Sequence, residues 1–485
     1  MRKCTVWTQR RVAPLLLACA PLLGQPAARQ PELVIRSNVH VVEVSIVATD
    51  AKGARAEGLT AADFRVWDDG KEQTIASFEK LDSQTNLAPA GLPPNTYSNR
   101  IGNQGQPQVL SMILLDANHT DWINQNFARW AVETILGQIE PGERVAIYAI
   151  GRDFRVIHDF SSDRQSLLNE IKAYHVDPQL FMPIEAKGYH RSGGDMRYTL
   201  DALKALADYV KGVPGRKNLI WLSVAFSLRA AAHFASSPMN EAMTALNNAN
   251  VSVYPVDPSG LGAASSPNVN TMKEIAGATG GKAYYDRNDL DRGVRLALDD
   301  TRETYLLTYS PKTIAQDGAY HAIRVQTTRP GVELRYRRGY NAPGREEPAG
   351  AEVTDRLASV VSSPLDVSSI GIRATVDQAP GGNDVSAVLH IDPADLELTP
   401  IGATWTGALR LEAVQTSAIG ERLGGVTQSA AINLQPATYR RALAQGLDFH
   451  MKFKRQPTAV AVRIGVVDQR GGNAGSLSVP LPPRR

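Results

Sequence analysis

The spacing of hydrophobic and polar residues changes along the chain, and each change predicts a different kind of structure. Residues 33–82 alternate with the period of two that is typical of β-strands. Within them, the turn sequence Asp68-Asp-Gly-Lys71 predicts a hairpin. Residues 83–108 are rich in Asn, Gln, Pro and Gly, which predicts a linker.

From Val109 onward, apolar strands alternate with helical patterns. Val109–Leu115 is apolar except for Ser111, which suits a strand buried on both faces. Residues 122–139 have helical spacing. The apolar positions of that helix are Ile123, Phe127, Trp130, Ala131, Ile135 and Ile139. Further strands are expected over 145–150, 154–160, 218–223, 251–256 and 282–285, and further helices over 164–174, 199–211, 238–249, 268–278 and 288–300.

This alternation with short joins indicates parallel strands with helices on both faces, a doubly wound α/β domain over residues 109–300. Residues 301–342 return to strand patterns, and we expect them to pair with 33–82 in one β-sandwich into which the α/β domain is inserted. A linker is expected over 343–352. Residues 353–485 show period-two runs without a long helical pattern, which predicts a C-terminal β-sandwich and an α/β + β fold class.

Composition narrows the class of protein. Hydrophobic residues make up 43% of the chain, so disorder is excluded as its dominant state. The 52 Lys and Arg residues nearly balance 49 Asp and Glu, and four of these bases lie in the first 28 residues, where no acid occurs. The rest carries 48 bases against 49 acids, so binding to nucleic acid through a basic surface has no support.

The N-terminus predicts an export signal. Its basic residues precede an apolar run, Val12–Leu23, and small residues follow at Ala27-Ala28. The basic residues are Arg2, Lys3, Arg10 and Arg11. We therefore expect a signal peptide over 1–28, a protein that is periplasmic, secreted or on the cell surface, and no transmembrane helix.

Both cysteines, Cys4 and Cys19, lie in this segment. A processed chain without them has no disulfide, thiol nucleophile or cysteine-bound zinc. Two other routes stay open: Leu16–Cys19 resembles a lipoprotein signal that would attach a lipid anchor to Cys19, and the Arg10-Arg11 pair suggests twin-arginine export.

A candidate metal site follows the first buried strand of the α/β domain. The sequence there is Asp116-Ala-Asn118-His-Thr120, and Thr199 opens a later helix. Ligands of open parallel sheets bind at the carboxyl ends of the strands. Carboxylate, amide and hydroxyl oxygens suit Mg²⁺ better than zinc, so these side chains are the candidate ligands.

These residues resemble the metal-ion-dependent adhesion site of the von Willebrand factor type A domain, which has the form Asp-x-Ser-x-Ser with a distant Thr and a distant Asp. Asp116 matches the first position, Thr120 the third and Thr199 the distant threonine, while Asn118 replaces a serine. The distant Asp should follow the strand that ends at Ser223, but no acid occurs there. The resemblance therefore implies a degenerate site with weak Mg²⁺ binding or none.

The wider pattern is similar to secreted bacterial proteins called VWFA-related, known chiefly from acidobacteria. The matching pieces cover residues 33 to about 342 in order. They are Gly58–Phe64, Asp68–Gly70, Leu114–Asp116, Pro214–Ser223, Tyr305–Tyr309, His321–Val325, Arg329–Gly331 and Arg338–Tyr340. The resemblance implies the α/β domain and an extracytoplasmic setting, but it implies no particular ligand.

Each candidate residue also has a plainer interpretation. Asp116 could cap the following helix or hold its own loop, and Thr199 could be only a helix N-cap. Strand alternation points His119 away from Asp116, so it is not counted as a ligand. The pair Arg216-Lys217 is more typical of a solvated turn than of an anion site.

No enzyme motif is present. The chain lacks His-Glu-x-x-His, a phosphate-binding Gly-x-x-x-x-Gly-Lys and a Gly-x-Ser-x-Gly elbow, and no spacing suggests a catalytic triad. We therefore expect no catalytic residues and an exported protein that binds or adheres to a protein ligand. A metal ion held at the candidate site would accept a carboxylate of that partner. Two alternatives stay open: a metal-independent scaffold that binds through its β-domains or helices, and an envelope hydrolase.

Overall fold

The computed structural model describes the chain in a set of ranges that together leave out its N-terminus and several loops. These ranges are 41–82, 92–101, 109–151, 153–175, 194–224, 238–261, 267–300, 302–311, 318–342, 350–378 and 382–482. They belong to one compact unit, His40–Arg485. The predicted signal peptide over 1–28, with Cys4 and Cys19, lies outside them. Within these ranges, no helix is both long and apolar enough to cross a membrane.

A five-stranded sheet forms the centre of the α/β segment, with the strand order β10-β9-β6-β7-β8. The strands are β6 (Leu110–Asp116), β7 (Arg144–Ile150), β8 (Phe154–Ser161), β9 (Lys217–Leu222) and β10 (Val251–Val256). The first four in this order run parallel, and β8 is antiparallel to β7 at one edge. Every residue of β6, β9 and β10 is buried, which is why these strands are apolar on both faces.

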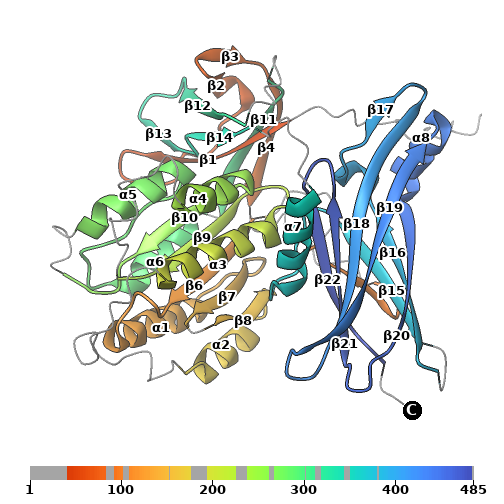
Figure 1. Cartoon of the computed structure of the whole chain (residues 1–485). Coiled ribbons are helices and arrows are strands. Elements are labelled where there is room, and N and C mark those ends of the chain that lie inside the picture. Colours follow the sequence, from red (N-terminus) through yellow and green to blue (C-terminus); the bar gives the residue numbers. More distant parts are fainter. Residues whose placement is uncertain are drawn as a thin grey trace, which may run out of the picture. The chain divides into compact units, whose positions relative to one another are not determined.

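Helices cover both faces of this sheet (Figure 1). They are α1 (Trp122–Leu136), α2 (Arg164–Ala173), α3 (Gly194–Val210), α4 (Pro238–Asn248), α5 (Pro267–Thr279) and α6 (Leu290–Asp299). Met112 and Leu114 of β6 share a core with α3, α4 and α5, whereas Ile113 and Leu115 share one with α1, α2 and α6. The mixed α/β class is thereby confirmed.

Two sequence expectations fail in this segment. Residues 282–285 do not form a strand; only Tyr284 pairs, through an isolated bridge to Val256. The apolar positions expected for α1 also divide between two faces, and of those within the helix only Ala131 and Ile135 lie on the buried one. Ile123, Phe127 and Trp130 are exposed, and the face on the sheet carries smaller residues. Its buried positions are Gln125, Ala128, Ala131, Val132, Ile135 and Leu136.

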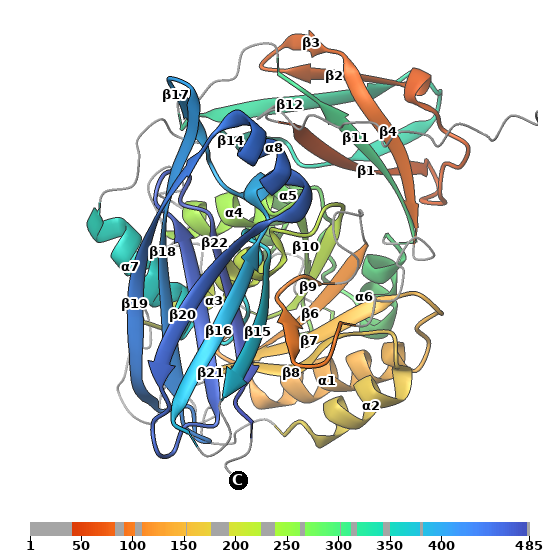
Figure 2. The same ribbon diagram turned by 90° about the vertical axis from the view of Figure 1, so that its right-hand side faces the viewer.

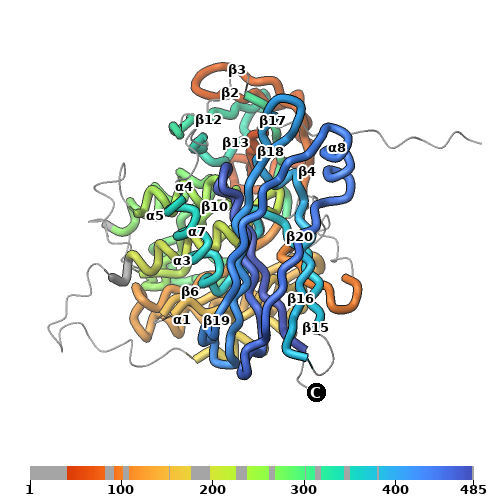
Figure 3. The backbone as a smooth tube through the Cα atoms, turned by 45° about the vertical axis from the view of Figure 1, so that its right-hand side comes forward, coloured from red at the N-terminus to blue at the C-terminus, as the bar shows by residue number. Residues whose placement is uncertain are grey.

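Strands from both sides of the α/β segment in the chain pair with one another. One sheet has the order β13-β1-β11-β4 and a second has the order β14-β12-β2-β3. The early strands are β1 (Val42–Asp50), β2 (Phe64–Asp68), β3 (Lys71–Gln73) and β4 (Ile75–Asp82), and the late ones are β11 (Glu303–Tyr309), β12 (Tyr320–Thr327), β13 (Val332–Arg335) and β14 (Gly339–Asn341). Both sheets contribute to one apolar core, and the early and late strands lie side by side in Figure 3.

Two further sheets share a core in the C-terminal part (Figure 2). One has the order β20-β16-β15-β5, the other β17-β18-β21-β22, with β19 paired to β18. The strands are β5 (Thr96–Ser98), β15 (Ile372–Gln378), β16 (Asp384–Ile391), β17 (Thr399–Ile401), β18 (Thr404–Thr416), β19 (Arg422–Leu434), β20 (Leu447–Lys454), β21 (Ala461–Asp468) and β22 (Ala474–Pro480).

This part corrects the linker and helix expectations. β5 comes from the segment 83–108, so residues 96–98 are not a linker but an edge strand on β15. Two helices are present, α7 (Gly350–Ser362) and α8 (Pro436–Gln445), and α7 begins within the expected linker 343–352. α7 buries Val353, Leu357 and Val360, whose helical spacing lies in a chain segment dominated by strand patterns.

Strand β6 is the central strand of its sheet and is fully buried. Leu114 is fully buried, so Leu114→Ala should lower the free energy of unfolding by about 3 kcal/mol through lost burial and a residual cavity. Ile419 is 88% exposed, and Ile419→Ala should change it by less than about 0.5 kcal/mol. Denaturant unfolding followed by tryptophan fluorescence measures both. Equal effects of the two substitutions would contradict the assigned core.

Candidate functional site

The candidate site lies at the carboxyl edge of the parallel sheet, where β6 ends in Asp116. This strand pairs with β7 and β9. Asp116 is paired with Ile150 at the end of β7, and Leu115 before it is paired with Leu222 at the end of β9. Its side chain is buried, with 2% of the residue exposed. An unmatched carboxylate here would cost free energy, so its hydrogen-bond partners decide what it can do.

Four donors meet the Asp116 carboxylate. Oδ1 accepts the backbone N–H groups of Asn118 (3.1 Å) and His119 (3.3 Å). Oδ2 accepts the indole N–H of Trp221 on β9 (3.1 Å). The His119 Nδ1 lies 3.1 Å from Oδ1 and 3.0 Å from Oδ2. A lone pair on Nδ1 would be repelled by the carboxylate at this distance, so we assign the ring proton to Nδ1, which then donates. A carboxylate offers about four lone-pair positions, and with this tautomer the protein's own groups occupy all of them.

The placement of His119 corrects the sequence-based expectation that it points away from Asp116. Alternation applies only to extended chain, and residues 117–120 form turns after the end of β6. The turn brings the imidazole back onto the carboxylate three residues earlier. Of the plainer interpretations of Asp116, the structure supports the one in which it holds its own loop. Helix α1 is capped by Asp121, which accepts the N–H groups of Ile123 and Asn124.

The other predicted ligands differ in what their polar atoms contact. Asn118 contacts it through its backbone N–H, and the Thr120 hydroxyl accepts the Val224 N–H (3.3 Å). Thr199 is the sixth residue of α3 and therefore not an N-cap. Its buried hydroxyl has no hydrogen-bond partner within the part of the chain that the structure describes, and the same holds for the hydroxyl of Ser223.

The surroundings of Asp116 decide whether a metal ion can bind at this edge of the sheet. A hollow with a free volume of about 10 Å³ adjoins Asp116, and no other carboxylate lines it among the described residues. The orphaned hydroxyls of Thr199 and Ser223 are potential oxygen ligands. Asp116, however, could bind a cation only if His119 left it. As arranged, His119 lies on the carboxylate that a metal ion would need, and the magnesium site stays a prediction.

Two residues that complete this edge were missed by the sequence analysis. Trp221 supplies the indole donor from β9. Gln125, on the buried face of α1, donates from Nε2 to the carbonyls of Ala117 (3.2 Å) and Thr120 (2.5 Å) and so fastens the loop to the helix. A polar residue on the core face of a helix was the available signal for Gln125. An apolar strand gives no signal that its tryptophan is a donor.

Helix α1 presents an apolar face to solvent directly after this loop. Trp122, Ile123, Phe127 and Trp130 are between 54% and 60% exposed. Their spacing places them on one side of the helix, opposite the residues that pack on the sheet. Large side chains of this kind are normally found in cores, so four of them together on a surface indicate a contact surface.

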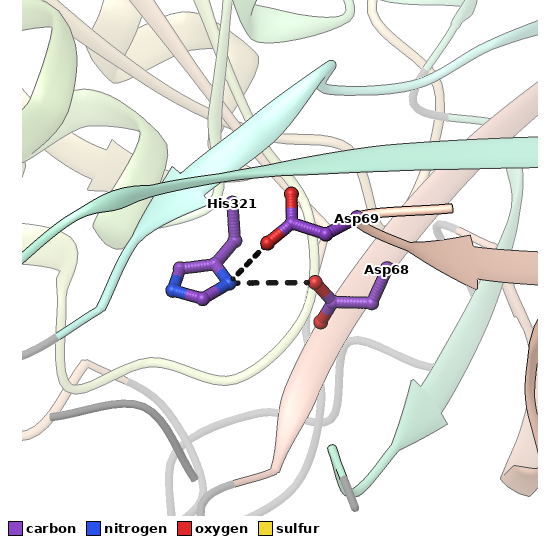
Figure 4. Close-up of side chains that lie close together, drawn as sticks. All are labelled: Asp68, Asp69 and His321. Carbon is purple, nitrogen blue, oxygen red and sulfur yellow. Dashed lines mark ion pairs between the residues drawn. The ribbon is translucent and has the colours of Figure 1, made fainter. Parts of the chain in front are cut away.

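A second group of possible metal ligands lies in the paired sheets. Asp68 ends β2, Asp69 follows in the turn, and His321 comes from β12 (Figure 4). One ligand atom from each lies within 4.8 Å of the other two. The His321 Nδ1 is 2.8 Å from Asp69 Oδ2 and 3.6 Å from Asp68 Oδ1.

Neighbouring donors satisfy this group as well. Asp68 Oδ2 accepts the hydroxyl groups of Tyr309 and Tyr340, each at 2.9 Å, and Asp69 Oδ1 accepts the Ala322 N–H at 2.8 Å. In the sequence, Asp68 and Asp69 indicate only a turn, because His321 is too distant along the chain to form a spacing motif with them. The cluster joins four of the pieces on which the family resemblance rests, and its bonds link β2, β11, β12 and β14.

Burial raises the pKa of Tyr309 and of Tyr340 far above the usual tyrosine value, and the Asp68 carboxylate raises both further. Each phenol therefore stays protonated in the folded protein at pH values where it ionises in the unfolded chain. A group whose pKa is higher in the folded state stabilises the fold below its unfolded pKa, and this contribution falls as the pH rises further.

Comparisons with known proteins identify no family. No protein-family model matches the chain, and no curated protein matches it. Among solved structures, the von Willebrand factor type A protein from Catenulispora acidiphila is 10% identical, with a TM-score of 0.29 over 87% of this chain and 75% of that one. An aerotolerance-related membrane protein from Bacteroides fragilis is 14% identical, with a TM-score of 0.28 over 40% of this chain and 98% of that one. BatB from Bacteroides thetaiotaomicron is 14% identical, with a TM-score of 0.26 over 40% and 98%.

The tyrosine–aspartate cluster predicts a specific alkaline instability. Above about pH 10 the free energy of unfolding should fall with pH, because the unfolded chain loses phenol protons that the folded chain keeps. Tyr309→Phe removes one such proton, so this fall should be less steep by about 1.4 kcal/mol per pH unit. Denaturant unfolding at a series of alkaline pH values measures the slope. Identical slopes for the variant and the wild type would contradict the shifted pKa.

Proposed function

We propose that this chain is an exported, non-enzymatic protein of the von Willebrand factor type A kind, which binds a partner protein at the carboxyl edge of its parallel sheet. In this proposal, the partner docks on the exposed face of α1 and on the adjoining loop from Asp116 to Thr120. We further propose that the α/β domain is inserted into the strand-rich segments, that the C-terminal part forms a separate β-sandwich, and that residues 1–28 direct export.

The exposed face of α1 is the observation that carries this proposal. Trp122, Phe127 and Trp130 are each slightly more than half exposed, and Ile123 lies between them. An aromatic side chain has an area of about 150–250 Å², so the four together expose on the order of 400 Å² of apolar surface. Tryptophan is enriched at the centres of protein interfaces. This surface therefore fits a partner with an apolar recess that takes aromatic side chains.

The hydrogen bonds of Asp116 support a partner site that needs no metal ion. Four donors hold the carboxylate, and Gln125 ties the loop to α1. Because these contacts are internal, the loop and the helix form one preformed surface. Preformed surfaces bind with a smaller loss of conformational entropy than surfaces that must rearrange.

A metal-dependent version is the second candidate. Its support is the pair of buried hydroxyls, Thr199 and Ser223, that lack partners within the described residues. In this version, Asp116, Asn118, Thr120 and Thr199 would hold Mg²⁺, and a partner carboxylate would complete the site. This version requires His119 to move away from Asp116. Only this version needs Mg²⁺, so partner binding measured with added Mg²⁺ and with chelator distinguishes the two candidates.

The test is capture of a partner from the envelope fraction of the source organism by the immobilised processed protein. We expect wild-type protein to retain one defined partner in chelator. The variant Trp122→Ser/Phe127→Ser/Trp130→Ser should retain it at least about tenfold less, since losing aromatic anchors from an interface costs more than about 1.4 kcal/mol. The substituted side chains are on the surface, so the free energy of unfolding should change by less than about 1 kcal/mol.

Ile419→Ser is the matched control, because Ile419 is an exposed apolar residue in the turn between β18 and β19. It should bind the partner as the wild type does. Full binding by the triple variant would refute the α1 surface. Binding that is lost in chelator and restored by Mg²⁺ would favour the metal-dependent candidate instead.

A further inference from the structure

A polar pocket lies at the opposite, amino edge of the parallel sheet. It has a free volume of about 230 Å³. The start of β1, the turn between α3 and β9, the turn between α4 and β10, and the segment between β13 and β14 all contribute to it. Its rim includes the exposed residues Val41, Lys211 and Asn248, and its inner part includes the buried residues Lys217 and Arg337.

The expectation that Arg216-Lys217 is a solvated turn is wrong, because both residues are no more than 1% exposed. Arg216 is satisfied away from the pocket by the side chains of Asn218 and Tyr254 and the carbonyl of Gly280. The Lys217 ammonium donates to the Val213 carbonyl (2.6 Å), and no carboxylate of the described residues lies within 4.0 Å of it. A buried ammonium that has no carboxylate within ion-pair distance is unusual and costly.

Arg337 is the second buried cation and is also not paired with a carboxylate. It donates to two backbone carbonyls, those of Asn247 (2.5 Å) and Glu43 (2.6 Å). Its Nε is buried and has no hydrogen-bond partner in the described part of the chain. With Lys211 at the rim, three cations and one carboxylate, Glu43, line the pocket, which leaves a net charge of +2.

We propose that this pocket binds a small dianion of the sulfate or phosphate class. A dianion balances the net charge of the lining, and its oxygens accept the ammonium protons of Lys217 and the free N–H of Arg337. The volume is below the range of about 300–1,000 Å³ that is typical of drug-sized ligands, so it suits a compact ion. The site lies away from the α1 surface, so this proposal does not depend on the proposed function.

The charge of Lys217 gives the site a pH dependence. Burial lowers the pKa of Lys217 to about 8, Glu43 on β1 acts in the opposite direction, and Arg337 lowers it further. The exposed Lys211, at the end of α3, is the other charged group that faces the pocket. The ammonium is therefore charged at pH 7 and becomes neutral as the pH rises past about 8, so anion affinity should fall over that interval.

Calorimetric titration of sodium sulfate at constant ionic strength tests this proposal. Sulfate keeps its charge of −2 from pH 7 to pH 9.5, so a change of its affinity with pH reports on titrating groups of the protein. We expect saturable 1:1 binding at pH 7 that is at least about tenfold weaker at pH 9.5, because one cation of the site is then neutral. Inorganic phosphate at pH 7.5 should bind at the same site, and acetate should bind much more weakly.

Lys217→Met is the central variant, since it keeps the apolar stem and removes the charge. It should fold, because apolar replacement of an unpaired buried charge is neutral or stabilising, and it should bind sulfate at least about tenfold more weakly. Lys204→Met is the matched control: Lys204 lies on α3 outside the pocket and pairs with Asp201 and Glu241. Absence of saturable binding by the wild type, unchanged binding by Lys217→Met, or acetate that binds as tightly as sulfate would each overturn the proposal.

Discussion

A buried carboxylate must be matched by donors, and the arrangement of the carboxyl edge follows from how Asp116 meets this requirement. It ends the central strand, all of whose residues are buried. The indole of Trp221 reaches it from β9, the turn brings back the His119 ring, and the loop offers two backbone N–H groups. These bonds fix the loop that leads into α1 and so fix the start of the helix whose outer face carries Trp122 and Trp130.

The two edges of the sheet differ in electrostatic character. At the carboxyl edge the Asp116 carboxylate is hydrogen-bonded within the chain, and the face that α1 exposes is apolar. At the amino edge Lys217 and Arg337 are buried without a carboxylate partner, and the charge is unbalanced. An apolar surface suits a protein partner, whereas an unbalanced cationic pocket suits a small anion. The two proposed kinds of recognition thus belong to opposite ends of one sheet.

Strands and helices of the α/β segment could be predicted closely, because buried parallel strands are continuous apolar runs: β10 was expected over Val251–Val256 and has those bounds. Contacts between residues that are distant in sequence could not be predicted. The apolar positions of α1 do not show which of them face the core, because two apolar faces compete on that helix and Ile123, Phe127 and Trp130 lie on the exposed one. His119 was misplaced because alternation ends where the strand ends. His321 meets Asp68 only through strand pairing across more than half of the described chain.

Calorimetric titration of Mn²⁺ into chelator-treated wild type, His119→Ala and Asp116→Ala tests whether the hydrogen bonds of its own chain saturate Asp116. We expect no saturable heat for the wild type at millimolar Mn²⁺, no heat for Asp116→Ala, and weak binding for His119→Ala, in which the lone pairs held by the imidazole become available. Saturable binding by the wild type that is lost in Asp116→Ala would contradict this expectation and would establish a working metal site at this edge.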